Sequence, residues 1–255
     1  MKYQVDLNSD LGESFGAYKI GQDDLIMDYI SSANIACGYH AGDHNVIAHT
    51  VKTASNKNIG IGAHPGLQDL IGFGRRPMEI DPEEAYNLIL YQIGAIQTFA
   101  STHQRKMNHV KPHGALYNMA CKDAGLAQAI AEAVYASDKN IVLFGLAGSE
   151  LVKKGKQAGL RTAEEVFSDR TYQPDGTLTA RTQDNAIIRD ADEALYRVIR
   201  MVKDGKVEST DGTDIDIQAD TICIHGDGQQ ALTFAEKLFK ELVKNEITIR
   251  RVGEK

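Results

Sequence analysis

The segment 109–113 alternates ionisable and apolar side chains, with His109, Lys111 and His113 separated by Val110 and Pro112. Successive side chains of a β-strand point to opposite faces, so the three ionisable groups would share one face. A histidine can act as a general acid or base near neutral pH, and a lysine can stabilise an oxyanion or bind a carboxylate or phosphate. The segment therefore favours hydrolytic chemistry on an anionic substrate.

Four further segments show the same alternation of an apolar face with a polar or ionisable face. Their polar-face residues, with those just beyond the segments, include Asp6, Asn8, Asn34, His40, His64, His225 and Asp227. A lone histidine at a strand end is more often structural, but five segments in register favour a catalytic pocket, because active sites of α/β barrels lie at the carboxyl ends of the strands. Asp10 and Glu13 would add carboxylates at the same end, with helix capping as the alternative for both.

Histidines and carboxylates together also leave a divalent metal site open. His40 and His44 are four residues apart and would share one face if both were helical. However, Gly42 and Asp43 look like the start of a helix, so we expect His40 to lie on a loop.

Several arginines follow the predicted strands, namely Arg75, Arg76, Arg170 and Arg181. Each alone would be expected to form a surface ion pair. Together they suggest that the substrate is an anion.

Short apolar segments alternate with helical patterns along the chain, which is typical of a parallel sheet. The predicted strands cover residues 3–8, 32–36, 59–63, 109–112, 141–146, 160–164 and 221–225. Asp81 and Pro82 indicate the start of a helix, and the alternation around Asp211 and Gly212 predicts a hairpin insertion near 206–218. We expect one domain, residues 1–255, with an α/β barrel fold. The alternative is an open, doubly wound sheet, but the acidic segment 8–13 follows the first strand where a dinucleotide-binding sheet would favour a glycine-rich loop.

The composition excludes several classes of protein. The 255 residues carry a formal charge of −7 with both signs mixed, which argues against a nucleic-acid-binding surface. There is no apolar run long enough to span a bilayer and none near the N-terminus, so we expect neither a membrane span nor a signal peptide. The three cysteines are far apart and form no C-x-x-C pair, which predicts free thiols and a cytoplasmic location.

Motifs along nearly the whole chain identify a family. The segments are DLNSDLGESFG at 6–16, NIACGYHAGDH at 34–44, IGAHPG at 61–66, GFGRR at 72–76, VKPHGALYN at 110–118, EVFSDRTY at 165–172 and CIHGD at 223–227. With these segments the sequence resembles the LamB/YcsF family, to which the A subunit of the prokaryotic ATP-dependent 5-oxoprolinase is assigned.

The resemblance implies an irregular, seven-stranded (β/α) barrel that is TIM-like and similar to the glycoside hydrolase/deacetylase folds. It also implies cleavage of 5-oxo-L-proline to L-glutamate coupled to ATP hydrolysis, in a complex with subunits B and C. No phosphate-binding loop of the G-x-x-x-x-G-K-[ST] type occurs in the sequence. We therefore expect the partner subunits to handle most of the ATP chemistry.

The chemistry of this reaction suggests roles for the candidate residues. Lys111 and either Arg75 or Arg76 would bind the anionic groups, and His64 or His113 would activate water.

His225 with Asp227 would protonate the departing nitrogen, and Asp10 would position water or a metal. The remaining candidates for substrate binding are Asp6, Asn8, Asn34, His40, Glu165 and Arg170. Two other functions stay open: a stand-alone, metal-dependent deacetylase or amidase, and a non-catalytic subunit that binds the substrate for its partners.

Overall fold

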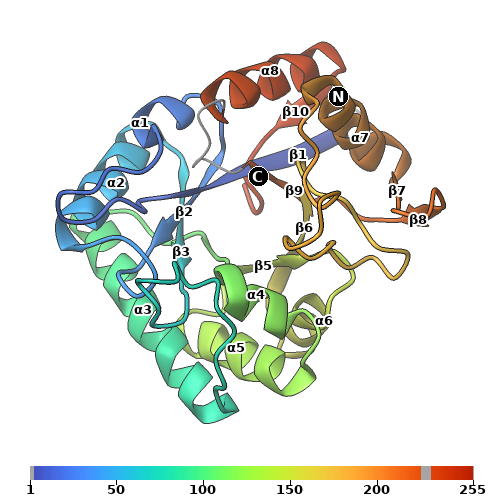
Figure 1. Cartoon of the computed structure of the whole chain (residues 1–255). Helices are drawn as coiled ribbons and strands as arrows, with labels where there is room; N and C mark the ends of the chain where they lie inside the picture. Colours follow the sequence, from blue (N-terminus) through green and yellow to red (C-terminus); the bar gives the residue numbers. More distant parts are fainter. Residues whose placement is uncertain (1–2, 225–230, 255) are drawn as a thin grey trace.

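A ring of parallel strands encloses the centre of the molecule, and helices surround it (Figure 1). The computed structural model describes residues 3–224 and 231–254. Within these residues, seven strands form the closed barrel predicted from the sequence, in the order β1-β2-β3-β4-β5-β6-β9, and β9 pairs again with β1. The barrel strands are β1 (Tyr3–Leu11), β2 (Ser32–Ala36), β3 (Gly60–His64), β4 (His109–Val110), β5 (Val142–Leu146), β6 (Arg161–Phe167) and β9 (Thr221–Ile224).

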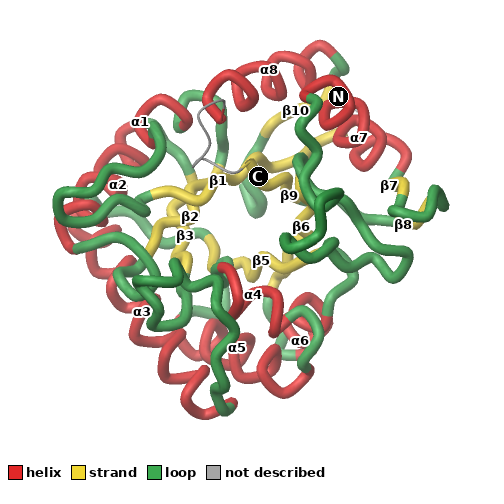
Figure 2. Tube along the Cα trace, viewed as in Figure 1, coloured by secondary structure: helices red, strands yellow, loops and turns green. Residues whose placement is uncertain are grey.

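The helices lie outside the strands, as Figure 2 shows by colour. They are α1 (Asp23–Ile26), α2 (His44–Asn56), α3 (Pro82–Thr102), α4 (Gly114–Ala120), α5 (Ala124–Ser137), α6 (Glu150–Gln157), α7 (Ala191–Asp204) and α8 (Ala231–Lys244). The predicted start of α3 is confirmed, because the Asp81 side chain accepts a hydrogen bond from the Glu84 amide at 2.8 Å and Pro82 occupies the first turn. Within the described residues, no helix combines the length and apolarity that crossing a bilayer requires.

Two pairings lie outside the barrel. β7 (Lys206–Glu208) and β8 (Asp214–Asp216) form an antiparallel pair of their own. β10 (Ile247–Ile249) pairs in parallel with the first residues of β1, whereas the later residues of β1 pair with β9. The sequence prediction missed β10, because a strand of three residues is too short for its periodicity to be recognised.

The predicted end of the first strand, at residue 8, is wrong, since β1 continues to Leu11. The polar run Asn8, Ser9, Asp10 suggested a loop. In the structure, Asn8 and Asp10 instead point into the barrel, where Asn34 donates hydrogen bonds to both. The strand is therefore longer than its polar composition predicted, because the polar side chains find hydrogen-bond partners inside the barrel.

The two faces of the strands contact different surroundings. Outward side chains such as Val5, Leu7 and Ile35 belong to the main apolar core between barrel and helices. Inside the barrel, Phe144 belongs to a small apolar cluster and stacks on His109 with ring centroids 4.3 Å apart. Much of the remaining interior is polar, with Asn8, Asn34 and His109 among its buried side chains.

Candidate active site at the carboxyl end of the barrel

Inside the barrel, the side chains nearest the amino ends of the strands form a hydrogen-bond network around Asp6. Asp6 accepts from the hydroxyls of Ser31, Ser32 and Thr221. Burial raises the pKa of Asp6 to about 6, although these three hydroxyl donors oppose the shift. The sequence analysis proposed Asp6 for substrate binding, but its oxygens are occupied by these hydroxyls, so the structure gives it a supporting position.

Asn8 and Asn34 connect this network to the mouth. Asn34 Nδ2 donates to Asn8 Oδ1 at 2.7 Å and to Asp10 Oδ1 at 2.8 Å, and His109 Nε2 lies 2.7 Å from Asn34 Oδ1. Both asparagines are fully buried. Asn34, which is hydrogen-bonded to Asn8, thereby holds the Asp10 carboxylate in place.

Lys111 is the centre of a buried charge cluster. Its Nζ lies 2.9 Å from Asp10 Oδ1, 2.8 Å from Glu165 Oε1 and 3.1 Å from Cys223 Sγ. Burial on its own lowers the pKa of Lys111, but Asp10, Cys223 and Glu165 outweigh it and hold the pKa well above its ordinary value. Tyr117 donates its hydroxyl to the other oxygen of Glu165 at 2.7 Å. The ammonium group is therefore charged and already faces two carboxylates.

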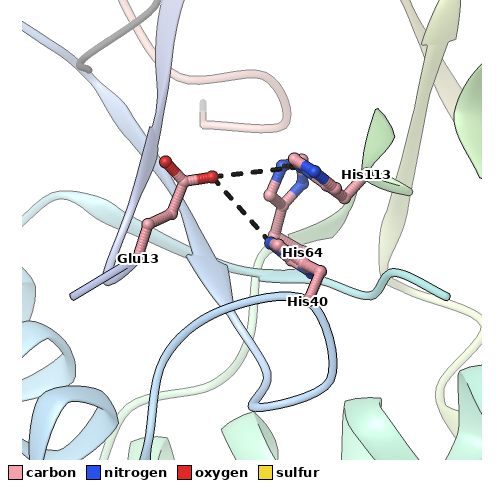
Figure 3. Close-up of side chains that lie close together, drawn as sticks. All are labelled: Glu13, His40, His64 and His113. Carbon is pink, nitrogen blue, oxygen red and sulfur yellow. Dashed lines mark hydrogen bonds and ion pairs between the residues drawn. The ribbon is translucent and has the colours of Figure 1, made fainter. Parts of the chain in front are cut away.

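A second group of side chains, the Glu13–His cluster, comprises Glu13, His40, His64 and His113, and these point toward one another (Figure 3). Glu13 follows β1, His40 lies on the loop after β2, His64 ends β3, and His113 precedes α4. All four residues are buried. One potential ligand atom from each lies within 4.8 Å of the others, so the cluster has the composition and spacing to hold a divalent metal ion.

Backbone carbonyls orient two of the three imidazoles. His64 Nδ1 lies 2.7 Å from the carbonyl oxygen of Lys111, and His113 Nε2 lies 2.8 Å from that of Phe73. The opposite nitrogens, His64 Nε2 and His113 Nδ1, are 2.9 Å apart. His40 stacks on His113 with ring centroids 3.7 Å apart.

Two rings of this cluster, His40 and His113, are uncharged near neutral pH. Burial, and next the neighbouring His64, lowers the pKa of His113 to about 3. Burial, followed by the proximity of His113 and His64, holds the pKa of His40 well below its ordinary value. The approaches of Glu13 Oε1 to His40 Nε2 at 3.8 Å and to His113 Nδ1 at 3.9 Å are therefore contacts with neutral rings, not ion pairs.

The three arginines proposed for substrate anions have different surroundings. Arg76 forms an ion pair with Asp69, and Arg170 donates to two backbone carbonyls of the loop that follows β6. Arg75 lies over the ring of Phe73, with 4.9 Å between its guanidinium carbon and the ring centroid. Phe73 packs edge-on against the rings of His40 and His113, so among the three arginines Arg75 lies nearest to the Glu13–His cluster.

Two of the predicted site residues, His225 and Asp227, lie outside the described residues. Glu13 was expected to add a carboxylate at the mouth, with helix capping as the alternative, and in the structure it faces the histidines. Its signal was its position just after a strand that carries inward carboxylates. His40 lies on a loop as expected, while His44 is at the start of α2.

Comparison with known proteins gives consistent matches over nearly the whole chain. The family model described as "LamB/YcsF family" matches residues 5–255. A protein of Oceanobacillus iheyensis, named as the A subunit of 5-oxoprolinase, is 64% identical over 251 residues, covering 98% of each chain. One of the same name from Halalkalibacterium halodurans is 58% identical, again over 98% of each chain. The crystal structure of a "Lactam Utilization Protein" from Thermus thermophilus superposes with a TM-score of 0.92 at 43% identity, covering 97% of this chain and 99% of that one.

Proposed function

The chain belongs to the LamB/YcsF family, and from this premise we propose that it is the A subunit of an ATP-dependent 5-oxoprolinase, which converts 5-oxo-L-proline to L-glutamate. The observation that carries the proposal is the identity of 64% over 98% of both chains with a protein of that name. The buried ring of carboxylate, lysine and imidazole groups at the barrel mouth supports it, because such groups are those that amide hydrolysis needs.

The lactam of 5-oxoproline is an unstrained amide and a poor electrophile. Phosphorylation of its oxygen by ATP would activate the ring carbon. Water then adds to that carbon, the carbon–nitrogen bond breaks as the nitrogen gains a proton, and a second water hydrolyses the resulting acyl phosphate. A protein that provides the water-activating groups needs basic nitrogens and a carboxylate next to the substrate.

We assign the water-activating position to the side of the barrel where His64 and His113 meet. Both are oriented by carbonyls, so each turns a basic nitrogen toward the same point. The Asp10 carboxylate lies 3.4 Å from His64 Nε2 and would orient the water. Because Lys111 already faces Asp10 and Glu165, its role is to fix the Asp10 carboxylate.

Arg75 is then the best candidate to bind the substrate carboxylate, because it lies over the ring of Phe73, which packs against His40 and His113. Protonation of the departing nitrogen by His225 with Asp227 stays a prediction.

Subunits B and C would bring the ATP, since the chain lacks a phosphate-binding loop of the P-loop type. Cys37, Cys121 and Cys223 are all free thiols, which is typical of a reducing compartment, so we place the complex in the cytoplasm.

The test is reconstitution with the two partner subunits. We expect glutamate release that requires this chain, both partners and ATP. His113→Gln should reduce turnover roughly 100- to 10,000-fold, the usual contribution of a general acid or base. His49→Ala is the matched control, because His49 is an exposed histidine paired with Asp24 on the outer surface.

Three results would contradict the proposal. Full glutamate release without this chain would exclude it from the reaction. Amide hydrolysis by the chain alone without ATP would favour a stand-alone deacetylase or amidase. Unchanged turnover in His113→Gln, with 5-oxoproline still bound, would favour a non-catalytic binding subunit.

A further inference from the structure

The side chains of the Glu13–His cluster bring one ligand atom each within 4.8 Å of one another, and we propose that the cluster binds one divalent ion of a late first-row transition metal, such as Zn²⁺. Its ligands are His64 Nε2, His113 Nδ1, a nitrogen of His40 and the Glu13 carboxylate. This inference deepens the proposed function, on which its catalytic meaning rests, while binding itself is measured on the chain alone.

The first argument is the location of the ring protons. A carbonyl oxygen only accepts hydrogen bonds, so the nitrogens that face the carbonyls of Lys111 and Phe73 must carry the hydrogens. An imidazole that carries its one hydrogen on the nitrogen facing a carbonyl has a lone pair on the other nitrogen, which is Nε2 in His64 and Nδ1 in His113. These two nitrogens face each other at 2.9 Å. Two lone pairs at this distance repel each other unless a cation lies between or beside them.

The second argument is His40. It is fully buried, and neither of its ring nitrogens has a hydrogen-bond partner among the described residues. Burying a polar group without a hydrogen-bond partner is unfavourable, so such a ring points to a ligand that it would contact. The only anionic member of the cluster, Glu13, lies within 3.8 Å of the His40 ring and 3.9 Å of the His113 ring.

The distances suit one ion. Ligands bound at about 2.0–2.2 Å lie no more than ~4.4 Å from one another. The separations of 2.9, 3.8 and 3.9 Å fall inside this limit. All four ligand atoms lie within 4.8 Å of one another, so an adjustment of at most about 0.4 Å brings every pair inside this limit.

The donor set decides the kind of metal. Three imidazole nitrogens and one carboxylate suit Zn²⁺ and its neighbours, whereas Mg²⁺ and Ca²⁺ prefer oxygen ligands. The carbonyls of Lys111 and Phe73 also occupy the place where metal-binding histidines usually have an orienting acceptor. When bound, such an ion would supply a Lewis acid that lowers the pKa of a water. His64 and His113 would then act on the water of the proposed function as ligands of the ion and not as bases, because each has only one lone pair.

Glycines leave the space that the rings need. A Cβ on Gly66 would lie 2.5 Å from His40 Nδ1, and one on Gly74 would lie 2.7 Å from His40 Cβ and 2.9 Å from His113 Cδ2. Any side chain at either position would push the imidazoles out of place. The loop from β3 to α3 is therefore built around these rings.

The test uses the purified full-length chain, treated with a chelator and then titrated with Zn²⁺ while bound metal is counted by mass spectrometry. We expect one Zn²⁺ per chain with a Kd below about 1 μM, and Co²⁺ in its place should give visible absorption bands. At about 100 times the Kd, Zn²⁺ should raise the Tm by roughly 5–10 °C.

Glu13→Gln keeps the size of the side chain and removes its charge, and His40→Asn removes a ring that makes no hydrogen bond among the described residues. Both should weaken Zn²⁺ binding at least 10-fold, while His49→Ala should not change it. Circular dichroism and the Tm of each variant without metal report whether it folds. Binding that is absent, or equal in all variants, would overturn the inference.

A shared proton is the competing explanation for the close pair of nitrogens. If nitrogen NMR at pH 7 showed an imidazolium at His64 or His113 in a chain that binds no Zn²⁺, the inference would be wrong. Metal binding without activity in the reconstituted complex would support the inference and contradict the proposed function. Activity without metal binding would do the reverse.

Discussion

Replacing Lys111 by methionine should destabilise the protein far more than the loss of packing would. Lys111 is 2% exposed, and its Nζ contacts Asp10 at 2.9 Å and Glu165 at 2.8 Å. Methionine keeps most of the apolar stem but removes the charge. The buried carboxylate of Glu165 and the partly buried carboxylate of Asp10 would then lie close together without a cation between them.

The size of the effect follows from this geometry. Removing one partner of a buried ion pair costs about 3–5 kcal/mol, because it leaves the remaining charge uncompensated. In a chain of this length, that corresponds to a fall in Tm of roughly 6–20 °C. Glu165, which is fully buried, should account for more of the loss than Asp10, whose side chain is 14% exposed.

The assay is thermal unfolding followed by circular dichroism at pH 7, with Lys111→Met/Glu165→Gln as the matched double variant. Glutamine keeps an oxygen for the Tyr117 hydroxyl, which donates to Glu165 at 2.7 Å, but carries no charge. The double variant should therefore be more stable than Lys111→Met, by about 1–3 kcal/mol. A single variant within about 1 kcal/mol of the wild type, or a double variant in which the two losses add, would refute the reasoning.

Three other perturbations test the supports of the site. Burial raises the pKa of Asp6 to about 6, so its carboxyl contributes stability below about pH 4 that is lost as the pH rises through 6. The free energy of unfolding, measured in urea, should therefore exceed that of Asp6→Asn by an amount that falls by up to about 3 kcal/mol between pH 4 and 7. A difference between the two proteins that does not change with pH would exclude this. Gly74→Ala places a side chain on a left-handed residue, at φ 62°, and against His40 and His113. The substitution should lower the free energy of unfolding by about 1–2 kcal/mol and weaken Zn²⁺ binding. An unchanged Tm and an unchanged Kd for Zn²⁺ would contradict the close packing of Gly74 against these rings. Asp43→Ala removes the N-terminal cap of α2 and should lower the free energy of unfolding by about 1 kcal/mol. The same urea unfolding assay measures this, and no change would show that the cap does not stabilise the helix.

The side chains at the ends of the strands could be predicted from the sequence, although the predicted strand 109–112 is too long, since β4 ends at Val110 and Lys111 and His113 follow it. The side-chain period of a strand is fixed by geometry, so the spacing of His109, Lys111 and His113 predicted that they share the barrel interior. The same reasoning placed Asp10 and His64 at the same end. The structure brings Lys111 to 2.9 Å of Asp10 and His113 to 2.9 Å of His64, across strands that are far apart in the sequence.

The partners of each charged group could not be predicted in this way. Arg76 and Arg170 follow strands, as an anion-binding arginine would, but their donors are used by Asp69 and by backbone carbonyls. Such pairings depend on loop conformations, which no local periodicity specifies. Glu13 illustrates the same limit, because its direction depends on the turn at Gly12, where φ is 70°.

Two kinds of electrostatic environment meet inside this barrel, and Lys111 belongs to both. Its ammonium group fixes Asp10 in a charged cluster, while its carbonyl oxygen orients His64 among the imidazoles. Asp10 closes the connection, since its other oxygen lies 3.4 Å from His64 Nε2. The histidines can act as bases or metal ligands only while they stay unprotonated. Burial and the neighbouring rings keep His40 and His113 unprotonated. Lys111, which the sequence predicted to bind the substrate, contacts two carboxylates in the structure and, through its own carbonyl, orients one of the imidazoles beside them.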